Sequence, residues 1–301
     1  MMPTIGQPGV PWGPTERATW RSRQQPQRSY EVELQRPIEA LADAWEVVPY
    51  GELAYDGQRF PLRALRSAVW RPELPTALVT GGVHGYETSG AHGALRFVQA
   101  HGRRFEGRVN LLVAPCVSPW GYEVVHRWNP EAVDPNRSFR PGTSCREAAA
   151  LMALVASLDR SPLLHIDLHE TTDTDRTVFR PTLAARDGTV ADDGPIPDGF
   201  YTVGDAARPE QAFQEAVVEA VARVTHIAEP DADGQIIGVP LTARGVILYD
   251  ARPLGLCMGM TDARFVTTTE VYPDSPRTSP EACIEAQVAA VTGAIEHALG
   301  A

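Results

Sequence analysis

The sequence changes from apolar to polar within Ala77-Leu-Val-Thr-Gly-Gly-Val-His-Gly-Tyr-Glu-Thr-Ser-Gly90. The apolar run predicts a buried strand, and the two glycines predict a tight turn at its carboxyl end. His84 and Glu87 follow in that turn, and a helix is expected to begin near Thr88. An imidazole and a carboxylate at this spacing can reach one metal ion, and two histidines with one glutamate form a known catalytic zinc site. The stretch therefore predicts a metal centre that takes a third ligand from elsewhere.

The third ligand is expected at the end of another strand. The segment Leu164-His-Ile-Asp-Leu-His169 alternates apolar and polar residues, so its three polar side chains share one face. His169 stands at the carboxyl end, where a polar turn begins, and is the better ligand. His165 lies deeper and is expected to be a core histidine, whereas Asp167 could orient a ligand histidine.

A lone carboxylate, Glu270, stands near the end of the β-branched segment Phe265-Val-Thr-Thr-Thr-Glu-Val-Tyr-Pro273. A glutamate beside a metal-activated water is the usual base in hydrolysis. Glu170 is the rival base. If the strand continued past His169, Glu170 would point to the opposite face, so Glu270 is preferred.

Two arginines are candidates for binding the substrate, Arg127 and Arg137. Arg137 follows Asn136 within Asn129-Pro-Glu-Ala-Val-Asp-Pro-Asn-Arg-Ser-Phe139, and Arg127 lies just upstream. A guanidinium fork binds carboxylates bidentately, and a guanidinium near a metal can stabilise an oxyanion. These residues are therefore candidates for a substrate clamp. A surface Asn-Arg pair in a loop is the alternative interpretation.

The remaining pattern alternates strands with helices. Strands are expected at 48–70 (a hairpin around Asp56-Gly57), 76–80, 108–114, 163–168, 200–203, 246–249 and 265–271, and helices at 37–47, 91–101, 145–158, 211–224 and 282–299. This predicts an α/β fold with a mixed, mostly parallel twisted sheet and helices on both faces. Residues 1–28 are expected to form an irregular N-terminal arm, and 29–301 a single catalytic domain. The polar loop 187–199 is either a rim or lid of the site or a surface insertion.

The composition excludes several classes of function. The 301 residues carry a net charge of −11 and include no lysine, which excludes Schiff-base and P-loop lysine chemistry. An acidic chain is also a poor nucleic-acid partner. Four scattered cysteines predict reduced thiols rather than a disulfide framework. With no apolar run of membrane-spanning length and no secretory leader, we expect a cytoplasmic protein without a membrane partner.

Taken together, these motifs resemble the zinc metallocarboxypeptidase (funnelin) family over roughly residues 77–273. The resemblance is carried by His84-Gly-Tyr-Glu87, Ser118-Pro-Trp-Gly-Tyr-Glu123, Arg127, Val133-Asp-Pro-Asn-Arg-Ser-Phe139 and Thr269-Glu270. The resemblance implies that one zinc ion is bound by His84, Glu87 and His169. It also implies that Asn136 and Arg137 bind the substrate's C-terminal carboxylate. Arg127 would stabilise the oxyanion, and Glu270 would be the general base. The family also carries a mobile tyrosine upstream of the base. Tyr249 is either that residue or a plain strand tyrosine.

Three departures from the family pattern keep the substrate open. Pro135 replaces a usual leucine, Asp167-Leu-His-Glu170 is closer to succinylglutamate desuccinylase and aspartoacylase, and Leu254–Asp262 matches no specificity pattern. We therefore expect a zinc carboxypeptidase acting on peptides, with an N-acyl amino acid deacylase as the alternative. Such deacylases continue into a β-rich domain, whereas only 31 residues follow Glu270 here. A non-catalytic binding module is a third hypothesis, which the full set of site residues disfavours.

Overall fold

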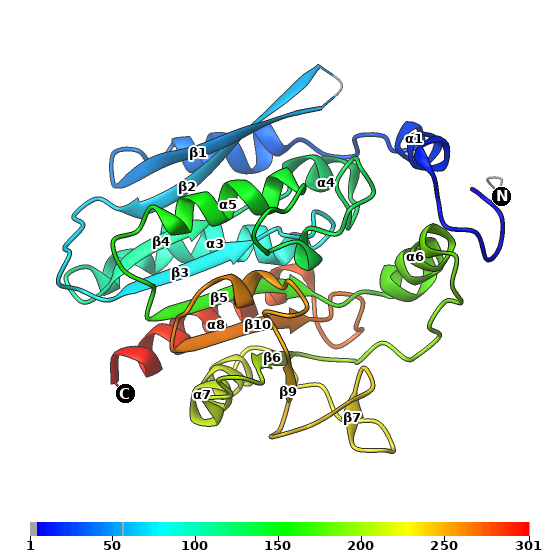
Figure 1. Cartoon of the computed structure of the whole chain (residues 1–301). Coiled ribbons are helices and arrows are strands. Elements are labelled where there is room, and N and C mark those ends of the chain that lie inside the picture. Colours follow the sequence, from blue (N-terminus) through cyan, green and yellow to red (C-terminus); the bar gives the residue numbers. More distant parts are fainter. Residues whose placement is uncertain (1–4, 56, 301) are drawn as a thin grey trace.

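The computed structural model of the chain describes residues 5–55 and 57–300. Eight strands form one sheet in the order β1-β2-β4-β3-β5-β10-β6-β9 (Figure 1). They are β1 (Trp45–Tyr55), β2 (Gln58–Ser67), β3 (Thr76–Gly81), β4 (Asn110–Ala114), β5 (Leu164–Glu170), β6 (Tyr201–Asp205), β9 (Val246–Tyr249) and β10 (Phe265–Val271). The four central strands β4, β3, β5 and β10 are parallel, whereas β1, β2 and β6 pair antiparallel with their inner neighbours. The predicted mixed, mostly parallel sheet is confirmed.

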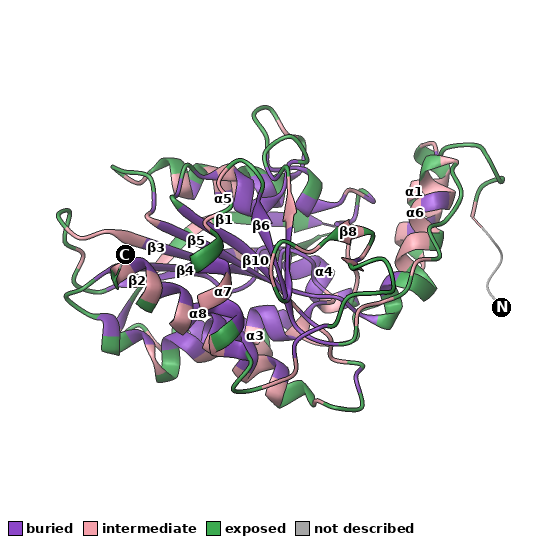
Figure 2. Cartoon of the chain, turned by 90° about the horizontal axis from the view of Figure 1, so that it is seen from below, coloured by how far each residue is buried: buried purple, intermediate pink, exposed green. Residues whose placement is uncertain are grey.

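Helices cover both faces of the sheet, as predicted. They are α1 (Pro14–Ser22), α2 (Arg36–Glu39), α3 (Thr88–Ala100), α4 (Pro119–Val124), α5 (Arg146–Ala156), α6 (Arg180–Asp187), α7 (Gln211–Val221) and α8 (Pro280–Gly300). Single turns are η1 (Glu31–Gln35), η2 (Gly102–Phe105), η3 (Pro135–Arg137), η4 (Asp175–Phe179) and η5 (Cys257–Met260), and β7 (Gln235–Ile236) pairs with β8 (Val239–Pro240). Helices α3 and α8 lie on one face and α5 on the other (Figure 2). In the described part of the chain, every helix is too short or too polar to cross a membrane.

The central strand β5 shows how the sheet separates apolar from polar chemistry. Leu164, Ile166 and Leu168 belong to the cluster that packs against α3 and α8. Their neighbours His165, Asp167 and His169 occupy the other face, as the alternation predicts. Every residue of β5 is nevertheless buried. The polar side chains of this strand must therefore find partners inside the protein rather than in water.

Two local expectations were wrong. The helix expected over 37–47 is only the short α2, because β1 already begins at Trp45 and pairs with Ser67 of β2. The arm expected to be irregular contains α1, whose Trp20 packs against Trp128 with ring centroids 5.6 Å apart. A nine-residue helix with few aliphatic residues gives little periodic signal, so only the tertiary contact of its tryptophan reveals it.

Helix α3 approaches β5 so closely that only glycine fits at their contact. A Cβ on Gly90, in the first turn of α3, would collide with the carbonyl group of Leu168. The same helix turn begins directly after Glu87. The close approach therefore fixes the turn that carries His84 and Glu87, the candidate metal-ligand turn, relative to the end of β5, where His169 lies.

We predict that Gly90→Ala destabilises the protein, although helix propensity alone would favour alanine by about 1 kcal/mol. The collision with Leu168 should outweigh this gain and cost about 1–3 kcal/mol net. Urea unfolding of the variant measures the effect. Gly300→Ala is the matched control, because a Cβ there meets no atom within 4 Å. A Gly90→Ala protein as stable as the wild type would contradict the close-packing argument.

Candidate metal centre and substrate cleft

Parallel pairing of β3 with β5 brings the three candidate metal ligands together. Gly81 pairs with Leu168, so the turn after β3 and the end of β5 meet at one edge of the sheet. His84 Nδ1 lies 2.7 Å from Glu87 Oε1, and His169 Nδ1 lies 2.6 Å from Glu87 Oε2. The two Nδ1 atoms are 3.2 Å apart. Residues 85 positions apart in the chain thus point their ligand atoms at a common centre.

This centre fits a metal ion. In the part of the chain that the structure describes, His84, Glu87 and His169 are the one such group of three, with ligand atoms within 4.8 Å of one another. Glu87 Oε2 is buried without a hydrogen-bond partner, although His169 Nδ1 is only 2.6 Å away. Two imidazole nitrogens and a carboxylate that converge this closely, with one carboxylate oxygen left without a hydrogen bond, are arranged as ligands of a shared cation would be. Two imidazoles and one carboxylate leave a position open for water or substrate.

Each histidine is oriented by a second carboxylate. His84 Nε2 lies 3.0 Å from Asp134 Oδ1, and His169 Nε2 lies 2.7 Å from Asp167 Oδ2. These contacts turn both Nδ1 atoms toward the centre, as outer carboxylates do in metal sites. Burial lowers the pKa of His169, but Glu87 and Asp167 outweigh burial and hold the pKa well above the ordinary value. The surroundings of His169 are therefore strongly negative and favour a bound cation.

Glu270 lies beside His169 because β10 pairs with β5 in that register. Thr171 donates its hydroxyl to Glu270 Oε2 at 2.9 Å. Burial raises the pKa of Glu270 to about 8, against the opposing effect of His169. One cavity of about 370 Å³ is lined by Glu270 together with His84, Arg127, Asn136, Arg137 and Tyr249. The structure thus brings every predicted site residue to one place, with Glu87 and His169 buried beneath the cavity.

Three arginines line this cavity, Arg127, Arg137 and Arg180, and the two that the sequence predicted are held differently. Arg127 donates from Nε to Asp134 Oδ2 at 3.0 Å and from Nη1 to the Tyr86 hydroxyl at 3.2 Å, and its guanidinium lies 4.2 Å from the Phe179 ring centre. It is fixed by contacts on several sides. Arg137 is exposed and donates from Nη1 to the carbonyl of Asn136 at 2.7 Å. A fixed guanidinium suits a reacting oxygen, whereas an exposed one can adjust to an incoming carboxylate.

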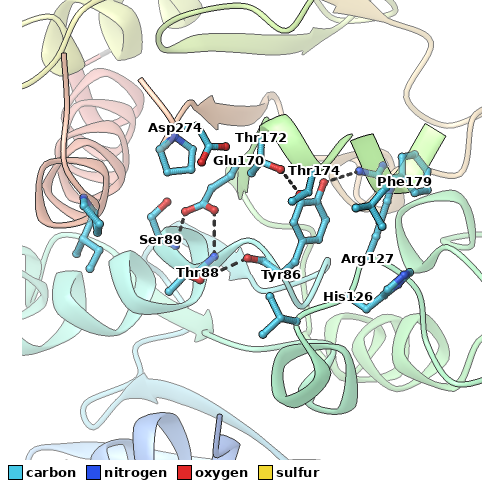
Figure 3. A pocket seen from close by; sticks show the side chains of 15 residues that line it. Tyr86, Thr88, Ser89, His126, Arg127, Glu170, Thr172, Thr174, Phe179 and Asp274 are labelled. Atoms are coloured by element: carbon cyan, nitrogen blue, oxygen red, sulfur yellow. Dashed lines mark hydrogen bonds between the residues drawn. The ribbon is translucent and has the colours of Figure 1, made fainter. Parts of the chain in front are cut away.

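Glu170, the rival base, lines the same cavity as Glu270, but its two carboxylate oxygens are engaged by the start of α3. It accepts the backbone N–H groups of Thr88 and Ser89 at 3.2 and 2.6 Å and so caps α3 (Figure 3). Burial raises the pKa of Glu170 to about 7, although the hydrogen bonds from Ser89 oppose it. Glu170 also lines a second hollow of about 470 Å³. That hollow shares Arg127, Glu170 and Phe179 with the first cavity, and most of the surface that it exposes is apolar.

Sequence reasoning missed several residues of the site. Asp134 stands inside the quoted Asn-Arg motif, but its contact with His84 was not foreseen. Asp175 accepts the Tyr86 hydroxyl at 2.6 Å and lies 3.6 Å from Arg127 Nη1. Asp134 could have been found from its place before Asn136 and Arg137. Asp175 lies in a polar segment after β5 that carries no comparable signal.

Comparison with known proteins identifies the fold. No family model and no curated protein matches the sequence. A candidate metallopeptidase from Shewanella amazonensis is 22% identical, with a TM-score of 0.65 over 91% of this chain and 98% of that chain. One from Shewanella denitrificans is 21% identical, with a TM-score of 0.65 over 90% of each chain. A metallo-carboxypeptidase from Pseudomonas aeruginosa is 16% identical, with a TM-score of 0.59 over 88% of this chain and 68% of that chain. The chain therefore has the zinc carboxypeptidase fold.

We predict that Asp167→Asn weakens metal binding by about 10- to 100-fold, because the neutral amide no longer stabilises His169 as a ligand. Competition between the protein and a chromophoric zinc chelator measures this affinity. Asp262→Asn is the control, because Asp262 pairs with Arg252 in an exposed ion pair. Equal zinc affinities in the two variants would contradict the orienting role of Asp167.

His165 gives a prediction about acid stability. It is fully buried, and burial lowers its pKa from 6.5 to about 4. The unfolded chain takes up a proton below pH 6.5, whereas the folded chain does so only near pH 4. Stability contributed by neutral His165 is therefore complete above pH 6.5 and is lost as the pH falls to about 4, on the order of 3 kcal/mol in total.

The variant His165→Gln should accordingly lose less stability than the wild type between pH 7 and pH 4. Urea unfolding of both metal-free proteins across that range gives the two slopes. Parallel curves would show that His165 does not titrate as its burial requires.

Proposed function

We propose that this protein is a zinc-dependent metallocarboxypeptidase that removes C-terminal amino acids from peptides. The observation that carries the proposal is the meeting of three buried candidate metal ligands, the half-buried Glu270 and three arginines at one cavity or directly beneath it. Hydrolysis of an amide needs a nucleophilic water, a base and stabilisation of the developing oxyanion. Each need has a matching residue in this set.

The chemistry divides among the residues as follows. A zinc ion held by His84, Glu87 and His169 would polarise the scissile carbonyl and acidify a water molecule. Glu270 takes the proton from that water and passes it to the leaving amine. Its raised pKa, about 8, suits a group that both accepts and donates protons near neutral pH. Arg127, held rigidly by Asp134 and Tyr86, donates hydrogen bonds to the carbonyl oxygen as negative charge develops.

The free carboxylate of the substrate would bind Arg137 and Asn136. The Asn136 Oδ1 atom accepts the backbone N–H of Cys257 at 2.7 Å. The amide nitrogen of Asn136 points away from Cys257 and would be the donor to the substrate. Tyr249 lines the same cavity and is the candidate for a tyrosine that closes on the substrate. The Pseudomonas aeruginosa metallo-carboxypeptidase is solved with (2-guanidinoethylmercapto)succinic acid, a ligand with two carboxylates. A carboxylate ligand of this kind is what Arg137 would recognise here.

The second hollow favours peptides over small acyl groups. Cavities of this size, about 370 and 470 Å³, lie within the range of small-molecule sites, and they adjoin at Arg127, Glu170 and Phe179. The C-terminal residue would occupy the first cavity, and the preceding residues would extend past Arg127 into the apolar second one. The alternative is an N-acyl amino acid deacylase, because the first cavity alone is large enough for an amino acid with a short acyl group.

Mass spectrometry of a substrate panel tests the proposal. The panel contains peptides with free C-termini, the same peptides amidated, and N-acyl amino acids, each incubated with zinc-loaded protein. Shortening of only the free-acid peptides by one residue is expected. Cleavage of N-acyl amino acids alone would establish the deacylase. A folded, zinc-loaded protein that cleaves nothing would favour a non-catalytic binding module.

Glu270→Gln should lower kcat about 1,000-fold while zinc content stays unchanged, because the amide cannot accept the proton of water. Steady-state kinetics and metal analysis of the same preparation check both parts. Glu170→Gln is the matched comparison, since Glu170 is also a glutamate with a raised pKa that lines the cavity, but its carboxylate caps α3. A larger loss of kcat in Glu170→Gln than in Glu270→Gln would reverse the assignment of the base.

A further inference from the structure

We infer that Arg28, in the N-terminal arm, is a positioning residue that holds the metal-ligand turn in place. The inference rests on the metal site proposed above and concerns a residue outside the motifs that define that site. Arg28 donates from Nη2 to the carbonyl of Gly85 at 2.5 Å and from Nη1 to the hydroxyl of Thr88 at 2.7 Å. These two residues bracket Glu87, and Gly85 directly follows His84. One guanidinium therefore hydrogen-bonds to both ends of the segment 85–88, which carries the candidate ligand Glu87.

The third nitrogen of the same guanidinium links this turn to helix α4. Arg28 Nε donates to the carbonyl of Tyr122 in α4 at 2.7 Å, and the guanidinium stacks over the Tyr122 ring at 3.6 Å. The arm itself is fixed to α4, because the Gln27 and Arg28 N–H groups both donate to the carbonyl of Glu123, at 2.7 and 3.3 Å. The guanidinium thus joins the metal-ligand turn to an element that does not contain a ligand.

The turn needs such an external support because of its own composition. A Cβ on Gly85 would collide with the backbone of Gly121 in α4, so this position must be glycine. A glycine has no side chain that could lock its conformation. The Gly85 carbonyl is held from outside instead, by a planar fork with several donors that a lysine could not reproduce.

Charge and geometry make opposite predictions for Arg28. Its hydrogen-bond acceptors are two carbonyl groups and a hydroxyl, and within residues 5–55 and 57–300 no carboxylate forms an ion pair with it. A cation near a metal site repels the metal, so the loss of its charge alone would tighten zinc binding. Loss of the hydrogen bonds to Gly85 and Thr88 would weaken zinc binding. The sign of the change separates the two effects.

The experiment compares Arg28→Gln and Arg28→Lys with the wild type in the full chain. Zinc affinity is measured by competition with a chromophoric chelator, and thermal unfolding of the metal-free proteins is measured in parallel. We expect both variants to bind zinc about tenfold more weakly. Arg28→Lys keeps the charge but loses the fork, so it should resemble Arg28→Gln.

Arg208→Gln is the matched control. Arg208 also donates to two backbone carbonyls, those of Ala263 at 2.6 Å and Thr261 at 3.2 Å, before the start of β10 and away from the candidate metal ligands. Unlike Arg28, it also pairs with the buried Asp205 at 2.9 Å, so its loss should destabilise the protein at least as much. It should lose stability but keep the wild-type zinc affinity. If Arg208→Gln weakened zinc binding as much as Arg28→Gln, the loss would reflect general destabilisation, and the inference would be overturned.

If Arg28→Gln does not fold, Thr88→Val still tests the inference. It removes one of the three acceptors of Arg28 and should weaken zinc binding less than Arg28→Lys, in the same direction. Wild-type or tighter zinc binding by both Arg28→Lys and Thr88→Val would overturn the inference. All of these readouts need no substrate, so a protein inactive on peptides would leave the result standing. A wild-type protein that binds no zinc would overturn the metal site itself.

Discussion

The site depends on the parallel pairing of β3, β5 and β10. Parallel strands end at the same edge of a sheet, so side chains that follow different strands meet there. Gly81 pairs with Leu168, and Glu270 pairs with His169, which sets the turn of His84 and Glu87, the candidate ligand His169 and the candidate base Glu270 side by side. A shift of one residue in either register would turn His169 or Glu270 to the opposite face. The close approach of Gly90 to Leu168 helps to fix this geometry.

Burial then decides the electrostatics of these side chains. Glu87, Asp134 and Asp167 surround two histidines out of contact with water, and Arg127 partly balances their charge by pairing with Asp134. An excess of buried carboxylates is costly unless a cation is bound. The same burial raises the pKa of Glu270, which lies one strand away and pairs with Thr171. A cluster that suits a cation and a glutamate with a raised pKa thus follow from one arrangement of acidic groups.

Support for the metal-ligand turn comes from elements that carry no ligand. Helix α4 contacts the turn so closely that Gly85 must be glycine, and the arm preceding η1 contributes Arg28 to the same place. Trp20 of α1 packs on Trp128, which precedes the Asn-Arg motif. The N-terminal arm is therefore packed against the two loops that form the site. This explains why residues far from the motifs in sequence can influence the geometry of the ligands.

The sequence by itself determined most of the elements and the candidate residues of the site. The alternation in β5 placed His169 and Asp167 on one face, and the glycine turn after β3 singled out His84 and Glu87, because local periodicity and turn chemistry depend on neighbouring residues alone. The α/β fold followed from the order of these elements. The tertiary structure alone decided which carboxylate orients which histidine, how Asp175 and Tyr86 fix Arg127, and where α1 and Arg28 pack. Those contacts join distant parts of the chain, and their geometry depends on how helices and strands pack, which no local pattern records.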